Sequence, residues 1–161
     1  MDAWHQRSNK KVTKVDALTT SQEGINLIKS FEGLRCDAYY CASDILTIGY
    51  GHTGPDVYES MMISELEAED LLRKDLVRFE DAVNSLITVE LTQSEFDATV
   101  SFAFNCGIGA LEESTFRKRI NSGESKPLCF QQEFPKWVNG ANGPLPGLVR
   151  RREAEVHLAT T

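Results

Sequence analysis

The feature that most constrains the fold is a long amphipathic pattern that begins at Ser64. Ser64 and Glu67 have the spacing of a capping box, in which each side chain satisfies a backbone N–H at the start of a helix. Apolar residues then recur at the three- and four-residue spacing of one helix face, at Leu71, Leu72, Leu76, Phe79 and Val83. The sequence therefore predicts one long helix in the middle of the chain.

Further helices are predicted on both sides of this long helix. A capping box at Thr20–Glu23 precedes apolar residues at helical spacing and predicts a helix over roughly 21–33. Another box at Thr92–Glu95 predicts a helix through Phe104 that ends at Gly107 and Gly109. The remaining helices are predicted over 114–122, 127–139 and 146–159, the last with Pro146 at its first position.

The segment between the first helix and the long helix has a different character. Residues 37–50 alternate, are rich in Tyr, Ile and Thr, and contain a plausible turn at Ser43–Asp44, so they predict a small β-hairpin or sheet. The predicted fold class is α+β, mostly α: a small N-terminal sheet lobe, a long connecting helix and a helical C-terminal lobe. We expect residues 21–161 to form this one domain, preceded by a flexible polar arm over 1–20.

Composition excludes several functions. Asp and Glu number 24 against 17 Lys and Arg, and this net charge of −7 argues against non-specific nucleic-acid binding. No apolar run approaches the length of a transmembrane helix, and the N-terminus lacks the apolar middle of a signal peptide. The four cysteines form no C-x-x-C pair and no ligand cluster exists, so we expect neither a metal nor another cofactor.

One carboxylate stands out at the end of the first predicted helix. Glu32 sits where the partial negative charge of the helix end and partial burial both disfavour an ionised side chain. A carboxyl that keeps its proton near neutral pH is what a general acid requires. The alternative is a solvated glutamate paired with Arg35, and these residue types alone leave both interpretations open.

The segment Thr47–Thr53, which reads TIGYGHT, raises a second question. Glycine in a strand marks either a bulge or tight corner, or the close approach of a ligand or another backbone. His52 within it could be a catalytic base or a buried histidine satisfied by one charged partner. Three arginines, Arg150–Arg152, could be surface charge paired with nearby glutamates, or one of them could reach the candidate site.

Together these residues resemble a known family. Glu32, Cys41 and Thr47 match the Glu-x8-(Asp or Cys)-x5-Thr pattern of phage-type lysozymes, glycoside hydrolase family 24, and Ile48–Thr53 is similar to the family's usual continuation. The later segments Leu91–Ala98, Ser101–Asn105 and Leu145–Arg152 also resemble family motifs. The resemblance runs from about Ser21 to about Leu158.

The resemblance implies a lysozyme-like fold with a cleft between the two lobes, and hydrolysis of the β-1,4 bond between N-acetylmuramic acid and N-acetylglucosamine. Glu32 would be the general acid, while Cys41 and Thr47 would position the attacking water. The resemblance also implies four saccharide-binding residues and a structural ion pair: Thr53, Phe104, Asn105 and Ser114; and His52 with Asp75. Among the three arginines, we expect Arg150 to be the one that reaches Glu32 and orders the cleft.

The implied biological role is that of a phage endolysin that lyses the host cell. Its partner would be bacterial peptidoglycan, it would be monomeric, and it would depend on a holin-type membrane permeabiliser to pass from the host cytoplasm to the periplasmic cell wall. Two rivals remain: a catalytically impaired peptidoglycan-binding protein, and a cysteine hydrolase that uses Cys41 and His52. A disulfide between Cys36 and Cys41 also stays open, because Cα separation decides it.

Overall fold

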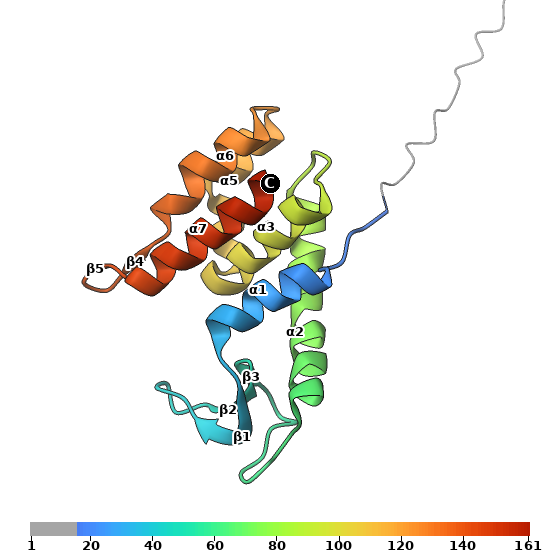
Figure 1. The fold of residues 1–161 in the computed structure, drawn as a ribbon, viewed down its shortest axis with the longest axis vertical. Helices are drawn as coiled ribbons and strands as arrows, with labels where there is room; N and C mark the ends of the chain where they lie inside the picture. Colours follow the sequence, from blue (N-terminus) through green and yellow to red (C-terminus); the bar gives the residue numbers. More distant parts are fainter. Residues whose placement is uncertain (1–15) are drawn as a thin grey trace, which may run out of the picture.

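The computed structural model of the protein describes residues 16–161. In chain order these residues form α1 (Gln22–Glu32), β1 (Arg35–Tyr40), β2 (Leu46–Gly49), β3 (His52–Thr53), α2 (Glu65–Leu86), α3 (Gln93–Cys106), α4 (Ile108–Glu113), α5 (Thr115–Asn121), α6 (Lys126–Glu133), the 3-10 helix η1 (Phe134–Lys136), β4 (Asn139–Gly140), β5 (Gly143–Pro144) and α7 (Pro146–Thr160). Figure 1 shows the sheet β1–β3 at one end and helices α3 to α7 grouped at the other, with α2 reaching from one group to the other. The fold is α+β and mostly helical, as predicted.

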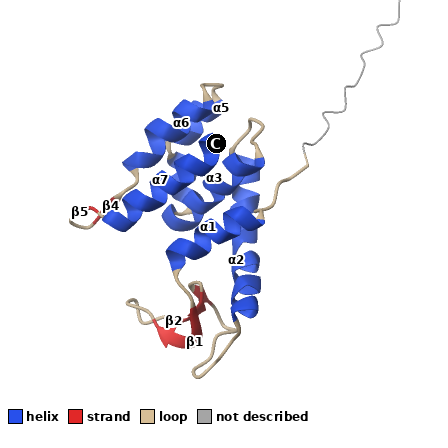
Figure 2. Ribbon diagram, in the orientation of Figure 1, coloured by secondary structure: helices blue, strands red, loops and turns tan. Residues whose placement is uncertain are grey.

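The three-stranded sheet is antiparallel, in the order β1–β2–β3, and holds most of the strand structure that Figure 2 shows. Tyr39 lies opposite Thr47, and Ile48 lies opposite His52. Gly49 ends β2 with a φ of +67°, and a Cβ added there would meet the Ala68 Cβ of α2 at 3.4 Å. That contact is an ordinary one, so the positive φ of the corner after β2, rather than a lack of space, is what favours glycine here.

Capping boxes start both α2 and α3, as their spacing predicted. The Ser64 hydroxyl accepts the Glu67 N–H at 3.1 Å, and the Glu67 carboxylate accepts the Ser64 N–H at 2.7 Å. Thr92 and Glu95 make the same reciprocal pair at α3. One side of α2 is buried along its length through Ala68, Leu72, Leu76, Phe79 and Val83. The sheet and the helical lobe are thereby joined by one continuously packed helix.

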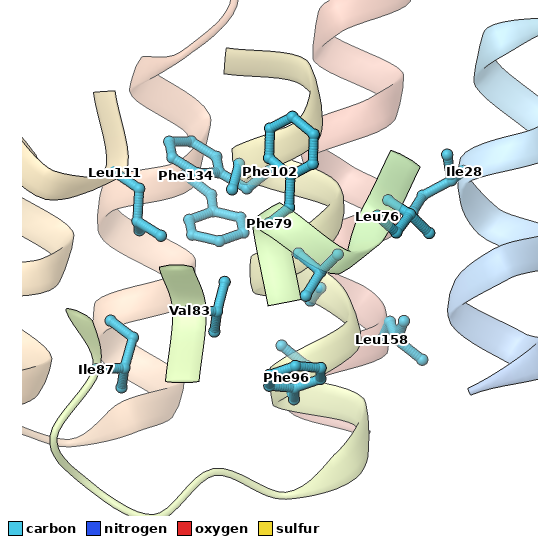
Figure 3. Packing of buried hydrophobic residues seen from close by; sticks show 14 of the residues in the cluster. Ile28, Leu76, Phe79, Val83, Ile87, Phe96, Phe102, Leu111, Phe134 and Leu158 are labelled. Carbon is cyan, nitrogen blue, oxygen red and sulfur yellow. The ribbon is translucent and has the colours of Figure 1, made fainter. Parts of the chain in front are cut away.

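The core lies around α3. Its residues from Glu95 to Ala103 are all buried, because other helices surround it on every side. Figure 3 shows side chains of α1, α2, α3, α4 and α7 meeting in this core, among them Ile28, Phe79, Phe96, Leu111 and Leu158. Phe102 stacks on Phe134 with ring centroids 4.6 Å apart, which fixes η1 against α3. None of the helices in residues 16–161 has the length and apolar character needed to cross a bilayer.

The segment before α1 is attached to α2. The Leu18 N–H donates to the Asn84 side chain at 3.3 Å, and the Asn84 amide donates back to the Leu18 carbonyl at 2.9 Å. The Thr20 N–H and hydroxyl both donate to the Glu80 carboxylate, at 2.9 and 2.7 Å. Residues 16–20 are therefore tethered and do not belong to the flexible arm predicted over 1–20. The rest of that arm, 1–15, lies outside the described residues.

Three local predictions were wrong. The cap of α1 is Ser21, whose hydroxyl accepts the Gly24 N–H, and the box predicted at Thr20–Glu23 does not form. Gly109 lies inside the unpredicted helix α4 rather than after α3. The predicted helix over 127–139 is interrupted, because α6 gives way to η1 at Phe134. Elements as short as α4, β4 and β5 contain too few residues to show a period in the sequence.

Candidate active site

Glu32 is the last residue of α1, and its place follows from the packing of that helix. α1 buries Ile25 and Ile28, and Gly33, with a φ of +72°, ends it. The Glu32 side chain is 24% exposed, and its Oε1 accepts a hydrogen bond from Nη1 of Arg151 at 2.5 Å. The candidate acid is therefore fixed by one charged hydrogen bond and stays partly open to solvent.

The arginine against Glu32 is Arg151, and not Arg150, which the sequence analysis had favoured among the three arginines. One residue along a helix turns the side chain by about 100°. Arg150 consequently faces solvent, whereas the Arg151 side chain is 4% exposed and points toward α1 and α3. The solvated pair between Glu32 and Arg35 is also absent, because Arg35 contacts Asp37 at 3.3 Å. The buried side of the last helix includes Arg151 and begins one residue after Arg150. The position of this buried side along the helix was the sequence signal that could have identified Arg151.

Cys41 and Thr47 lie together at the far end of the hairpin. Cys41 follows β1, and its N–H donates to the Ile45 carbonyl at 3.0 Å. The Thr47 hydroxyl donates to the same carbonyl at 2.8 Å, and Thr47 is buried. Backbone N–H groups of Ile45 and Ser43, with a further contribution from the Thr47 hydroxyl, lower the pKa of the Cys41 thiol. This environment favours the thiolate, which is a better proton acceptor than a neutral thiol.

All four cysteines, Cys36, Cys41, Cys106 and Cys129, are free thiols in the structure. The disulfide between Cys36 and Cys41 that the sequence left open is therefore not formed. Cys41 is partly exposed, so its sulfur is accessible to reagents.

His52 joins the sheet to α2. Its Nδ1 lies 2.8 Å from Asp75 of α2, and its Nε2 lies 2.9 Å from Asp56, a partner that the sequence analysis missed. Burial lowers the pKa of His52, but the hydrogen bonds to Asp75 and Asp56 outweigh it and raise the pKa above its ordinary value. Both ring nitrogens are occupied by carboxylates, so the geometry is that of an ion pair. His52 and Asp56 are four residues apart in the sequence, and this spacing could have indicated Asp56 as a second partner.

The predicted saccharide-binding residues fall into two groups. Asn105 and Thr53 are exposed, and Phe104 is half-buried with its ring edge-on to Phe79 at 5.2 Å between centroids. Ser114 is buried: its hydroxyl donates to the Leu111 carbonyl and accepts the backbone N–H that caps α5. The Ser114 hydroxyl therefore caps α5, and the binding role expected for this residue stays a prediction.

A hollow of about 430 Å³ lies beside Asn105, between the end of α3 and the start of α7, and is lined by Asn105, Cys106, Lys136, Trp137, Asn139 and Leu148. A second hollow of about 500 Å³ lies at the C-terminal end of α2 and contains none of the candidate site residues. Residues 16–161 contain no group of three or more His, Cys, Asp or Glu arranged to hold a metal ion.

A partly exposed acid at the end of a helix, a polar hairpin directly after it and a mostly helical second lobe define a lysozyme-like protein. The model of the family described as phage lysozyme matches residues 29–155. The chain therefore belongs to the phage lysozyme family.

Individual relatives agree with this assignment. The endolysin of Bacillus phage B103 is 49% identical over 146 residues, covering 89% of this chain and 55% of that protein. A mutant of P22 lysozyme superposes with a TM-score of 0.83 at 34% identity, covering 89% and 99% of the two chains. The muramidase domain of SpmX from Asticaccaulis excentricus gives a TM-score of 0.80 at 40% identity, covering 89% and 98%. The chain spans about half the length of the Bacillus phage endolysins that it matches.

Proposed function

We propose that this chain is a muramidase that cleaves the β-1,4 bond between N-acetylmuramic acid and N-acetylglucosamine in bacterial peptidoglycan, and that it works as a phage endolysin. The observation that carries the proposal is the Glu32 carboxyl, partly exposed at the end of α1 and held by Arg151 at 2.5 Å. The endolysin names of several relatives and the muramidase name of the SpmX domain support the same activity.

Glu32 is the proposed general acid. It protonates the glycosidic oxygen as the bond to the anomeric carbon breaks, and Arg151 fixes the direction in which the carboxyl points. The Cys41 thiolate accepts a proton from a water that attacks the opposite face of the sugar, and Thr47 helps to orient that water. An acid and a water-positioning group on opposite faces describe an inverting hydrolysis, for which the two groups stand about 6.5–9.5 Å apart. The proton balance closes when Cys41 later loses its proton and Glu32 regains one from solvent.

The proposal extends to the rest of the substrate and to the cell. Thr53, Phe104 and Asn105 are assigned to the saccharide, and Asn105 also lines the hollow between the end of α3 and the start of α7.

The enzyme acts as a monomer on the host cell wall, after synthesis in the host cytoplasm and release by a holin-type permeabiliser. Expression in a host with and without such a permeabiliser tests this last part, because lysis should require both.

The decisive test of activity compares wild type with Glu32→Gln on purified peptidoglycan. Loss of the general acid should lower the rate of reducing-end release by a factor of about 10²–10⁴. Mass analysis of the products should show muropeptides with N-acetylmuramic acid at the reducing end. Glu23→Gln, an exposed glutamate in the first turn of the same helix, is the matched control and should keep the wild-type rate.

The same assay judges the rival interpretations. A folded wild-type chain that binds peptidoglycan but releases no reducing ends would identify a catalytically impaired binding protein. Wild-type turnover by Glu32→Gln, with circular dichroism confirming the fold, would remove Glu32 from the mechanism.

A further inference from the structure

A network of buried charges lies where α7 packs on α3. The side chains of Glu155, Arg152 and Arg151 are only 0%, 1% and 4% exposed. Burial of charges is unfavourable unless they are paired, and replacing a buried ionic network by apolar side chains is often neutral or stabilising. Burial raises the pKa of Glu155, against the lowering effects of Arg152, Ser101 and Arg151. Stability alone is thus a weak explanation for this network.

Glu155 is the centre of the network. Its Oε1 accepts hydrogen bonds from the Ser101 hydroxyl at 2.7 Å, from Arg152 Nη2 at 3.2 Å and from Arg151 Nε at 3.3 Å. Its Oε2 lies 2.9 Å from Arg152 Nε, although neither of these two atoms has an aligned hydrogen-bond partner. One carboxylate therefore holds both guanidinium groups.

The two arginines diverge from this point toward separate parts of the candidate site. Arg151 reaches α1, where its Nη1 donates to Glu32 at 2.5 Å. Arg152 reaches the end of α3, where Nη2 donates to the Asn105 side-chain oxygen at 2.6 Å and Nη1 contacts the Cys106 sulfur at 2.7 Å. Glu32 and Asn105 are thus each connected to the Glu155 carboxylate through one arginine.

We propose that Glu155 is a positioning residue, which orients Glu32 through Arg151 and Asn105 through Arg152. It touches neither substrate nor water. Its role is to fix the directions of the Arg151 and Arg152 guanidinium groups. These two groups in turn hold Glu32 and Asn105, which are the residues assigned to the substrate. This inference rests on the proposed muramidase activity and assigns to that activity a residue buried between α7 and α3.

The test is Glu155→Gln, which keeps the shape of the side chain and removes its charge. With soluble N-acetylglucosamine–N-acetylmuramic acid oligomers, we expect kcat to fall roughly 10- to 100-fold, because small displacements of a catalytic group have effects of this size. KM should rise as well, because Asn105 loses its fixed orientation. Ser101→Ala removes one of the hydrogen bonds to Glu155 and should give a smaller version of the same change in both constants.

The matched control is Glu133→Gln. Glu133 is a second buried glutamate with two cationic partners, Arg119 and Lys136, but it lies in α6 and forms no hydrogen bond or ion pair with a residue assigned to the site. Glu155 and Glu133 variants should lose comparable thermal stability, while only the Glu155 variant should change kcat and KM per folded molecule.

Unchanged kcat and KM in folded Glu155→Gln, measured beside an active wild type, would overturn the positioning role and leave the muramidase proposal intact. Equal kinetic losses in the Glu133 variant would also overturn it, because the effect would then be a general consequence of burying an amide. An inactive wild type would overturn both proposals together.

Discussion

At the scale of single residues, Cys41 is the most unusual part of the site. A side-chain thiol ordinarily has a pKa of about 8.5 and accepts a proton poorly at neutral pH. Here the backbone N–H groups of Ile45 and Ser43 lower the pKa of the Cys41 thiol, so a larger fraction is thiolate. The turn around Cys41 thus supplies hydrogen-bond donors that stabilise the thiolate.

Replacing Cys41 by Asp should preserve lytic activity, because a carboxylate can take over the position of the thiolate. The acidic limb of the activity profile should move to lower pH, since an ordinary Asp titrates near about 3.9 and an ordinary thiol near about 8.5. A pH–rate profile on peptidoglycan checks both points. A folded but inactive Cys41→Asp enzyme would contradict the water-positioning role and favour a cysteine nucleophile.

Alkylation gives the control for that experiment. Iodoacetamide should inactivate wild type and Cys36→Ser but leave Cys41→Asp active, since Cys36 and Cys41 are both partly exposed and only Cys41 is assigned to the mechanism.

The two carboxylates around His52 predict a role in stability rather than in chemistry. Its raised pKa means that the folded state favours the charged imidazolium, so the stabilisation is fully present below the ordinary histidine value of about 6.5 and is lost as pH rises through the folded value. His52→Asn should therefore lower Tm by several degrees near pH 5.5 and by less near pH 8.5, at roughly 2–4 °C for each kcal/mol.

Thermal melts at the two pH values measure this effect, with His157→Asn, a change at an exposed position of α7, as control. Activity below Tm should change little in both variants. A pH-independent Tm difference for His52→Asn, or a large loss of kcat in folded protein, would make His52 part of the reaction.

At the scale of elements, α2 depends on its first turn. The reciprocal bonds between Ser64 and Glu67 satisfy two N–H groups where the sheet lobe ends and the helix begins. Ser64→Ala should lower the free energy of unfolding by about 1 kcal/mol, the usual contribution of a cap. Chemical denaturation measures it, and Ser85→Ala, an exposed serine within the same helix, should be neutral or slightly stabilising. Equal losses of unfolding free energy in the two variants would show that the Ser64 cap does not stabilise the helix more than an ordinary serine does.

At the scale of the whole molecule, the candidate site is assembled from distant parts of the chain. Glu32 and Arg151 are 119 residues apart in sequence, and their contact requires α7 to be packed on α3. Closing so long a loop carries an entropic cost that the helical core has to offset first. The orientation of the acid is therefore a property of the folded helical lobe, while the thiol and threonine are positioned locally by the hairpin.

Much of the fold could be read from the sequence because it depends on local interactions. The capping boxes at Ser64 and Thr92, the apolar period of α2 and the alternation after Glu32 each act over a few residues, so they predicted element type and order. The lysozyme pattern of Glu32, Cys41 and Thr47 was likewise a matter of spacing alone.

Local patterns in the sequence were enough to predict the longer helices, the small N-terminal sheet and the family. Three features needed the folded chain: which arginine meets Glu32, the use of Ser114 as a buried cap, and the place of Glu155 between two guanidinium groups. The reason is physical: these contacts depend on the rotation of one helix against another. That rotation is set by the packing of whole side-chain layers rather than by any short stretch of residues.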